Sequence, residues 1–514
     1  MRRGKKENSK VDWTVFGLSG GLLLLFALLS FISMEAVGLF VSETFAWSAA
    51  YFGAFWQVLM LATFAVAIVL AFSTYGKVRL GNTSSPELSN FKWISIIMAT
   101  LLAGGGVFWA AAEPMYHFME VPPLRGGITE GTQEAVAPAL SQSFMHWGFL
   151  AWAILGTISA VVMMYGYYHK GMPMKPRTLL YPMFGRRLNE SVWGKVIDAF
   201  SIIAVAAGTI GPIGFLGLQA SYGLEALFGI PDIFMTQLGI IIGVVAISTV
   251  SAVTGLHKGI QLLSRFNVTL AIVLMLAVLI LGPGGFIIDS FISSFGTYVH
   301  QFIPMSTYRG DQGWLSFWTL FFWGWFIGYG PMMAMLISRI SRGRTIREIV
   351  IAVGIIAPVV TTFWFTIVGG SGIFFELNNP GSVSNALNEA GMPASMIAIT
   401  EQLPLAVIIS PLFLLLTVLF VVTTADSMAY TIAMGVTGQG NPGKSMRIFW
   451  AILMGTIAVI LLYLGEGSID ALQSFIVVTA VPVSILLFPM LWLAPRAARK
   501  LAEEQGLVTP SKRS

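Results

Sequence analysis

The stretch VFGLSGGLLLLFALLSF, residues 15–31, contains no charged side chain and few polar ones. Comparable apolar runs occupy residues 56–72 and 270–281. A helix of about 20 apolar residues suffices to cross the hydrocarbon core of a bilayer. Only 10% of the 514 residues are charged, whereas soluble globular domains carry about 25%. The chain therefore lacks the polar residues needed to cover a surface in water, and we expect lipid to surround it.

Hydropathy predicts an all-α polytopic membrane protein with twelve transmembrane helices. They are expected near residues 13–40, 48–74, 92–112, 140–168, 196–228, 233–255, 266–288, 314–338, 346–374, 404–435, 447–465 and 470–494. We divide the chain into a basic cytoplasmic N-terminus (1–12), two peripheral helices (13–91), a first five-helix repeat (92–288), an amphipathic interfacial segment (289–313), a second five-helix repeat (314–495) and a short cytoplasmic tail (496–514).

The positions of the basic residues predict the orientation of the chain. With the N-terminus inside, all 29 Lys and Arg residues except Arg125 and Arg309 fall on the inner side. Such an excess is typical of cytoplasmic loops. We therefore expect a multi-pass protein of the bacterial inner membrane with both termini in the cytoplasm. Membrane lipid is the expected partner, and the net charge of +5 does not require nucleic acid.

Several functional classes find little support in the sequence. The absence of cysteine excludes disulfides, thiolate metal sites and a cysteine nucleophile. A membrane-embedded enzyme would need a nucleophile with its base or a metal cluster, but the histidines occupy loops or helix ends without ligand spacing. These are His117, His146, His169, His257 and His300. No recurring filter element of a channel is evident, whereas a transport-like sensor stays open. We expect neither an enzyme nor a cofactor.

Glycines weaken the third and eighth predicted helices, which each begin a set of five. The third contains Gly104, Gly105 and Gly106, and the eighth contains Gly328 and Gly330. Each glycine weakens a helix by about 1 kcal/mol relative to alanine. Because five is an odd number, the second set must be inverted in the membrane. The pattern predicts broken helices with a binding site at the repeat interface. The alternative is that the glycines permit close helix packing.

Aromatic residues follow one face of the eighth predicted helix at spacings of three or four. They are Trp318, Phe322, Trp325, Phe326 and Tyr329. Trp147 and Trp152 lie deep in the fourth helix, although tryptophan usually favours the membrane interface. Aromatic faces attract a quaternary ammonium group by about 0.5 to 2 kcal/mol per contact. The rings therefore indicate either a cage for a cation or simple filling of space between helices.

Several motifs carry a resemblance to a known family. They are FWTLFFWGW at 317–325 and on to Pro331, ISRISRGRTIRE at 337–348, YGKVRLG at 75–81, Glu113-Pro114, His146-Trp147, KGIQ at 258–261 and TADS at 424–427. In this order they are similar to the betaine/choline/carnitine transporter (BCCT) family over residues 10–495. The resemblance implies secondary transport of a small quaternary ammonium solute. It also implies a LeuT-like core of two inverted repeats, helices 3–7 and 8–12, and a homotrimer.

The resemblance also implies an aromatic cage. The family positions fall on Trp147, Trp152 and Leu155 in the fourth helix and on Phe326 in the eighth, with Tyr329 at another family tryptophan position. Leu155 replaces a tyrosine and Phe326 replaces a tryptophan. A looser cage would accept a different onium compound, such as a sulfonium. Alternatively, the site lies toward further tryptophans, namely Trp109, Trp323 and Trp325.

The coupling ion is predicted from the same resemblance. Sodium-coupled members hold Na⁺ between backbone carbonyls, here near Ala99 to Leu102, and two hydroxyls, here Thr423 and Thr424. Oxygen ligands suit such a hard cation, although adjacent threonines also bond back to their own helix. Sodium-independent members place an arginine where this chain has Val268, with Arg265 one turn earlier. Proton coupling through Asp426 and sodium-independent exchange are the alternatives.

Overall fold

The computed structural model describes residues 11–101, 105–254, 257–438, 442–466 and 469–509, without the side chains of 99–101 and 257–264. These residues fold almost entirely into helices, and the β-type pairing among them is an isolated bridge between Arg79 and Thr345. The all-helical class predicted from the sequence is confirmed. The main helices are α1 (Trp13–Ile32), α2 (Met34–Phe72), α3 (Asn90–Leu101), α4 (Val107–Met119), α5 (Val136–Trp147), α6 (Phe149–Gly156), α7 (Ile158–Met164), α9 (Val192–Phe228), α10 (Phe234–Thr254), α11 (His257–Leu281), α12 (Gly284–His300), α15 (Phe321–Ile340), α17 (Ala357–Asn378), α20 (Ala406–Thr437), α21 (Lys444–Leu464), α22 (Asp470–Leu487) and α23 (Met490–Glu504).

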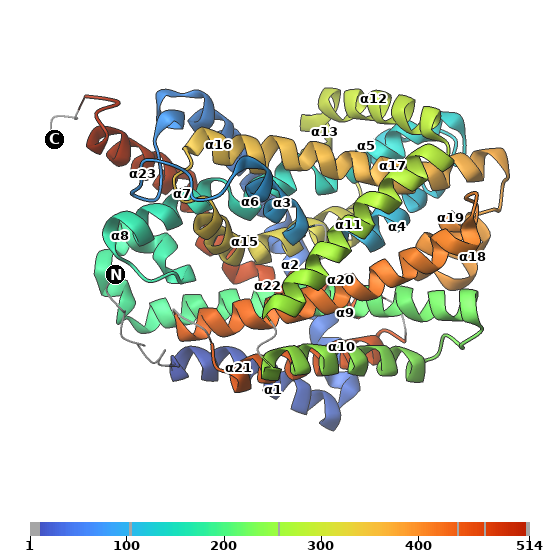
Figure 1. The fold of residues 1–514 in the computed structure, drawn as a ribbon, viewed down its shortest axis with the longest axis horizontal. Coiled ribbons are helices and arrows are strands. Elements are labelled where there is room, and N and C mark those ends of the chain that lie inside the picture. The colour runs from blue at the N-terminus through green and yellow to red at the C-terminus, as the bar shows by residue number, and fades with distance from the viewer. Residues whose placement is uncertain (1–10, 102–104, 255–256, 439–441, 467–468, 510–514) are drawn as a thin grey trace.

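Shorter helices connect these elements. They are α8 (Tyr181–Phe184), α13 (Phe302–Ser306), α14 (Gln312–Leu315), α16 (Ile346–Ile351), α18 (Ser384–Ala390) and α19 (Ser395–Thr400). Figure 1 shows α9, α10, α17 and α20 running along the long axis of the molecule. This common direction is the one expected for helices that cross a bilayer together.

Ten helical segments of the described chain are long and apolar enough to cross a membrane, or eleven if the bent pair 265–281 and 284–300 forms one span. The predicted span 92–112 corresponds to α3 and α4, between which residues 102–104 lie outside the described residues. The chain is therefore a multi-pass membrane protein. The exact number of twelve stays a prediction.

The first two predicted helices meet at a different place from the one expected. The sequence predicts a loop between residues 40 and 48, but α2 continues through it and the break falls at Ser33, whose hydroxyl accepts from Ala36 N–H. Ser42 and Thr44 donate to helix carbonyls one turn earlier. Their polar groups are thus satisfied within the helix, and no residue there forces an interruption.

The interfacial segment predicted at 289–313 is a surface helix that starts earlier, at Gly284. α12 turns by 103° from α11 and packs against α5 and α17. Its buried positions Ile287, Ser290, Ser294 and Tyr298 recur every three or four residues. The Tyr298 hydroxyl accepts from Phe149 N–H at 3.0 Å, at the junction of α5 and α6. This contact fixes the surface helix to the interior.

The interior is formed by the α5–α7 segment, α9 and α15. The most apolar windows of 133–169 and 312–340 are each 94% buried, and that of 192–228 is 89% buried, whereas α1 and α10 reach 33%. Within this interior, α15 contacts α6, α7, α9 and α22. The side chains of α15 are thus surrounded by protein on all sides, which makes it the central element of the fold.

Two of the sequence motifs meet although they are far apart in the chain. Leu80 N–H donates to the Arg344 carbonyl at 2.9 Å, and Gly343 N–H donates to the Leu80 carbonyl at 2.8 Å. The Arg344 guanidinium lies 4.4 Å from the ring centre of Trp93. We call this pairing of residues 75–90 with residues 341–348 the basic clasp. It joins the end of α15 to the segment that follows α2.

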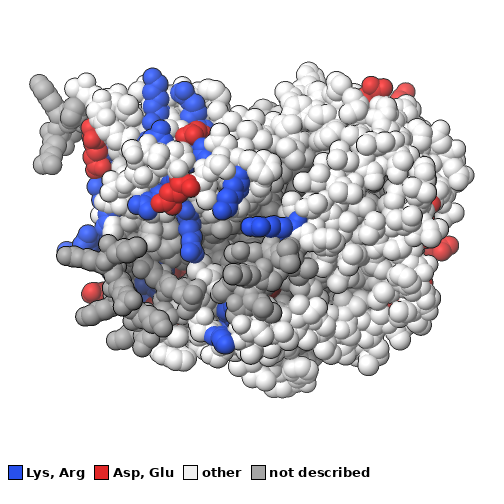
Figure 2. All heavy atoms as spheres, in the orientation of Figure 1, with Lys and Arg blue, Asp and Glu red and all other residues white. Residues whose placement is uncertain are grey.

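The basic residues gather at one end of the molecule. Figure 2 shows Lys and Arg over the end that carries α8 and α23 in Figure 1, whereas acidic groups without basic neighbours lie at the opposite end of this face. The asymmetry expected from the sequence is therefore present in the folded chain. It agrees with the basic end lying at the inner surface of a membrane.

Gly343 provides a test of the basic clasp. Its φ of +85° is unfavourable for other residues, and an added Cβ would meet the Ser85 carbonyl oxygen and lie 2.8 Å from Pro86 Cα. We expect Gly343→Ala to lower the free energy of unfolding by about 1–3 kcal/mol. The measurement is thermal unfolding of the purified protein in detergent. Gly127→Ala is the matched control, since Gly127 has a φ of +93° with nothing within 4 Å of the added Cβ. Equal losses would show that backbone strain alone acts.

Candidate functional site

The predicted glycine break in the third span lies beside the aromatic residues. Gly104 falls outside the described residues, while Gly105 and Gly106 form an irregular turn just before α4. A Cβ on Gly105 would lie 2.6 Å from Trp325 Cη2, and the Gly106 carbonyl accepts from Trp364 Nε1 at 2.8 Å. The missing side chain of Gly105 therefore lets the Trp325 indole approach the backbone. The Gly106 carbonyl accepts the hydrogen bond of the Trp364 indole.

The break predicted at Gly328 and Gly330 is not present. α15 continues without interruption from Phe321 to Ile340, and the irregular stretch is a π-helical turn at Ser316–Leu320. A Cβ on Gly330 would lie 2.6 Å from Leu487 Cδ1, and one on Gly328 would lie 3.6 Å from Ala204 Cβ. Close packing against α22, rather than a broken helix, accounts for Gly330, whereas a Cβ at Gly328 would make only an ordinary contact with α9.

Trp147 lies at the centre of an aromatic cluster between α5, α15 and α17. Its ring centre is 5.2 Å from Phe326, 5.9 Å from Trp325, 5.4 Å from Phe322 and 5.1 Å from Phe365. The first three contacts are edge to face. We call Trp147, Phe322, Trp325, Phe326 and Phe365 the aromatic cage. The rings contact one another in the interior, and aromatic faces carry the negative potential that attracts a cation.

Two rings of the cage lie parallel. Trp325 and Phe326 are 5.8 Å apart with 6° between their planes. Trp325 Nε1 donates to the Gly208 carbonyl in the middle of α9 at 3.0 Å. The missing side chain of Gly208 is required here, because its Cβ would collide with the Tyr329 ring and lie 3.2 Å from Trp325 Cδ1. Helix α9 thus sets the plane of the Trp325 ring.

The other predicted cage residues lie at different distances from this centre. Trp109 adjoins the cage through Phe322, with ring centres 4.8 Å apart. Tyr329 borders it through Gly208, and its hydroxyl lies 3.2 Å from Thr209 Oγ1. Trp152 donates from Nε1 to Thr361 Oγ1 at 3.1 Å. Trp323 is fully buried, and among the described rings it has no contact with the cage. The structure thus brings together Trp147, Trp325, Phe326 and, at the margin, Trp109 and Tyr329.

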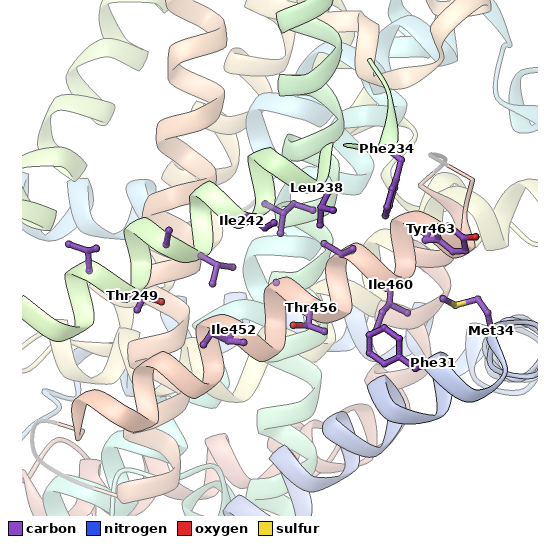
Figure 3. Close-up of a pocket in the computed structure, with 16 residues that line it drawn as sticks. Phe31, Met34, Phe234, Leu238, Ile242, Thr249, Ile452, Thr456, Ile460 and Tyr463 are labelled. Atoms are coloured by element: carbon purple, nitrogen blue, oxygen red, sulfur yellow. The ribbon is translucent and has the colours of Figure 1, made fainter. Parts of the chain in front are cut away.

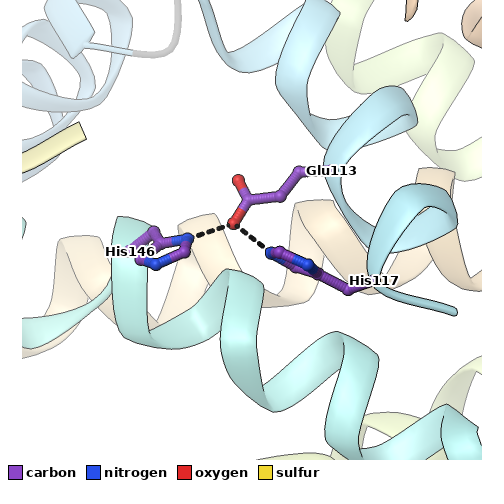
Figure 4. A group of neighbouring side chains, drawn as sticks. All are labelled: Glu113, His117 and His146. Atoms are coloured by element: carbon purple, nitrogen blue, oxygen red, sulfur yellow. Dashed lines mark hydrogen bonds and ion pairs between the residues drawn. The ribbon is translucent and has the colours of Figure 1, made fainter. Parts of the chain in front are cut away.

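Trp147 forms a hydrogen bond to a buried polar group, and Figure 4 shows the three residues of that group, Glu113, His117 and His146. Glu113 Oε2 accepts from Trp147 Nε1 at 2.8 Å, while Glu113 Oε1 lies 2.5 Å from His146 Nδ1 and 3.4 Å from His117 Nε2. All three side chains are buried. We call Glu113, His117 and His146 the acid–histidine cluster. The expectation that the histidines would form no group is therefore wrong for two of them, because helix spacing places His117 one turn after Glu113 and packing brings α5 beside α4.

The acid–histidine cluster is the one group of three possible metal-binding side chains found among the described residues. Its geometry is that of a hydrogen-bond network. Around tetrahedral Zn²⁺, ligand atoms about 2.0–2.2 Å from the ion lie about 3.3 Å from one another. The 2.5 Å contact between Glu113 and His146 is instead a direct hydrogen bond, and Nε2 of His146 lies 2.9 Å from Thr319 Oγ1.

The residues predicted to hold sodium lie on α20. Thr423 and Thr424 are both buried, and Thr423 Oγ1 donates to the Leu419 carbonyl at 2.8 Å. Asn267 Nδ2 lies 3.4 Å from Thr423 Oγ1. On the carbonyl side of the predicted site, Leu102 falls outside the described residues. The threonine half is thus placed in the interior, and the sodium site stays a prediction.

Asp426, the acid considered for proton coupling, has a basic partner. Arg447 Nη2 lies 3.2 Å from Asp426 Oδ1, and both side chains are buried. A buried carboxylate with a guanidinium beside it is stabilised in its charged form. Its surroundings therefore favour a structural ion pair between α20 and α21 over a site that gains and loses protons.

A separate groove of about 780 Å³ opens between α10 and α21, as Figure 3 shows. Phe31 and Met34 close one end of it, and its lining is otherwise almost entirely aliphatic. Thr249, Thr456 and Tyr463 contribute the hydroxyl groups. Its lining residues carry no charge, and their three rings, Phe31, Phe234 and Tyr463, are fewer than the five of the aromatic cage, so the groove is the weaker candidate for binding an onium group.

The chain is similar to known transporters over nearly its whole length. Residues 14–503 match the family model described as BCCT, betaine/carnitine/choline family transporter. "Glycine betaine transporter 2" of Vibrio parahaemolyticus is 54% identical over 96% of this chain and 91% of its own length. "Glycine betaine transporter OpuD" of Bacillus subtilis is 33% identical over 95% and 93%. "High-affinity choline transport protein" of Escherichia coli is 31% identical over 94% and 71%.

Proposed function

We propose that this chain, which belongs to the betaine/carnitine/choline family of transporters, imports glycine betaine or a closely similar quaternary ammonium solute by secondary active transport. The matched proteins are transporters and not enzymes, and so is this chain. Glycine betaine is named in two of the relatives described above, and choline in the third. Both compounds carry a trimethylammonium group, which defines the substrate class.

The aromatic cage is the observation that supports this substrate. Trp147, Trp325 and Phe326 are buried and held in fixed planes by hydrogen bonds or stacking. A trimethylammonium group cannot donate a classical hydrogen bond. Aromatic faces, which are apolar and have a negative electrostatic potential, are therefore suited to bind it. Because the rings are pre-positioned, little conformational entropy is lost when the substrate binds.

We further propose that import proceeds by alternating access within a LeuT-like core of two inverted five-helix repeats, one in each half of a twelve-helix protein. Na⁺ is the proposed coupling ion, held by Thr423 and Thr424 together with carbonyls of the third span. The burial of both hydroxyls supports this assignment. The assembly is a homotrimer in the bacterial inner membrane with both termini in the cytoplasm, in keeping with the basic end seen in Figure 2.

The second candidate is proton-coupled or exchange transport of a related onium compound, such as a sulfonium. Two departures from the family pattern favour it: Leu155 and Phe326 each provide less aromatic surface than the residues they replace. Leu155 is buried in α6 and can contribute only dispersion contacts to a substrate. A smaller or differently shaped onium group would then fit as well as trimethylammonium.

Removal of one ring tests the aromatic cage. Trp325→Ala and Phe326→Ala should each weaken the apparent affinity for glycine betaine about 5- to 30-fold, the equivalent of about 1 to 2 kcal/mol from one cation–π contact. Initial rates of uptake into proteoliposomes give the affinity. Trp450→Ala, which removes an equally buried ring from α21, is the control for general loosening of the protein. Unchanged affinity in both cage variants would place the binding site elsewhere.

Sodium dependence tests the coupling ion. Uptake should require Na⁺, and the double variant Thr423→Val/Thr424→Val should lose this dependence together with concentrative uptake, because the change removes two oxygens at nearly constant volume. Initial uptake is measured with Na⁺ replaced by K⁺ at constant pH and membrane potential. Thr431→Val, an exposed position on the same helix, is the control. Full activity of the unmodified protein without sodium would refute the proposal.

A further inference from the structure

The acid–histidine cluster contains a buried carboxylate whose oxygens contact neither lysine nor arginine among the described residues. Glu113 interacts with the neutral indole of Trp147 and with two imidazoles. Two other acids of the described chain are buried, and each has an arginine beside it. Asp426 pairs with Arg447, and Asp198 pairs with Arg177 at 2.7 Å. A buried charge is costly unless it is paired. A proton is therefore the available means of neutralising Glu113.

The hydrogen-bond partners of His146 define how the cluster holds its protons. Its Nε2 lies 3.0 Å from Gln142 Nε2 and 2.9 Å from Thr319 Oγ1, and the amide and the hydroxyl can both donate to it. Nε2 is then an acceptor, and Nδ1 carries the hydrogen shared with Glu113. This tautomer is assigned from the partners. Glu113 accepts this hydrogen bond, and the proton that would neutralise its charge is an additional one.

His117 offers a second place for a proton. Its Nε2 is buried, has no hydrogen-bond partner among the described residues and lies 3.4 Å from Glu113 Oε1. The His117 ring also lies 4.5 Å from Trp318 and 5.8 Å from His146. An unpartnered nitrogen at this position can accept a proton and then donate to the carboxylate. The cluster can thus gain one positive charge without moving its backbone.

The remaining titratable groups of the surrounding helices are directed elsewhere. Tyr116 packs on Trp318, and Tyr298 accepts from Phe149 N–H. Asp289 is exposed on α12, and Asp311 accepts from Trp314 N–H. Glu376 binds the loop at 381–384, and Tyr222 is partly buried on α9. Among the described residues, the two histidines are therefore the ionisable partners of Glu113.

The cluster is connected directly to the aromatic cage. Glu113 Oε2 accepts from the indole nitrogen of Trp147, and His146 is the preceding residue in the chain. The His146 ring also stacks on Phe322 with centres 5.1 Å apart. A proton placed on Glu113 would weaken the hydrogen bond that orients Trp147, because a charged acceptor binds more strongly than a neutral one. It would also remove the negative charge behind the cage.

We propose that Glu113, His146 and His117 form a proton-binding site that positions Trp147, so that the site binds a proton and the aromatic cage binds its substrate in competition. This inference rests on the proposed function, since it assigns a role to groups behind the same substrate site. Acidification weakens substrate binding because both the orientation of Trp147 and the negative charge are lost. By thermodynamic linkage, bound substrate must weaken proton binding by the same factor by which a bound proton weakens substrate binding, so substrate binding releases protons.

Substrate binding at different pH values tests the site. Glycine betaine is titrated into purified full-length protein at constant Na⁺ between about pH 5.5 and pH 8.5, a range that brackets the ordinary titration of imidazole. The affinity of the unmodified protein should fall about tenfold toward the acid end, as expected for the loss of one charge-assisted hydrogen bond. Glu113→Gln should bind weakly at every pH and show no such slope. A flat profile for the unmodified protein, or an unchanged slope in Glu113→Gln, would overturn the proposal.

Two further measurements separate protonation from a purely structural role. His146→Asn keeps an N–H donor near the position of Nδ1, so it should retain high affinity while the pH profile becomes flatter. Calorimetry in buffers of different ionisation enthalpy should detect proton release from the unmodified protein and none from Glu113→Gln. His300→Gln, which removes an exposed histidine of α12, should leave both readouts unchanged.

The outcomes also distinguish this inference from the proposed function. If the unmodified protein binds neither glycine betaine nor choline at any pH, the proposed function fails and the role of the cluster fails with it. If binding is normal but neither affinity nor binding heat depends on protons, only the proton-binding site is refuted. A pH slope that persists in His146→Asn and in Glu113→Gln would assign the titration to another part of the protein.

Discussion

Hydrocarbon offers no hydrogen-bond partner, so each polar group that this chain brings into the bilayer must be satisfied by another part of the chain. Helices satisfy the backbone, and specific contacts satisfy the side chains. Asp198 and Asp426 lie beside arginines, whereas Glu113 lies among an indole and two imidazoles. The first arrangement fixes a charge in place. The second leaves the charge of the carboxylate dependent on a proton.

The same requirement explains how the aromatic cage is held together. The indole nitrogens of Trp147 and Trp325 need acceptors in the interior, and these are the Glu113 carboxylate and the Gly208 carbonyl. Each hydrogen bond fixes a ring plane that dispersion forces alone would leave variable. Gly105 and Gly208 provide the space in which Trp325 can approach the backbone. Polar satisfaction and close packing therefore define one geometry together.

Helix α15 connects this site to the basic end of the molecule. It carries Trp325 and Phe326 in its first half and ends at Ile340, directly before the basic clasp. The clasp binds the end of α15 to residues 75–90 through backbone hydrogen bonds, and the contact of Arg344 with Trp93 extends this attachment into α3. Any movement of α15 relative to the segment after α2 must also move this attachment. The two most distinctive motifs of the sequence thus lie at the two ends of one element.

The sequence by itself determined the membrane class and most of the helical segments, and it placed Phe322, Trp325 and Phe326 on one face of a helix, because apolar length, charge bias and helical spacing are local properties. It misplaced the first helix break and predicted an interruption in α15, since glycine and polar residues are compatible with a continuous helix when neighbours pack closely or accept their hydrogen bonds. Only the tertiary structure brought His146 to Glu113, which helix spacing alone had already placed one turn before His117 in α4. Those contacts depend on how α4, α5 and α15 pack against one another, and no spacing within a single helix specifies a distance between helices.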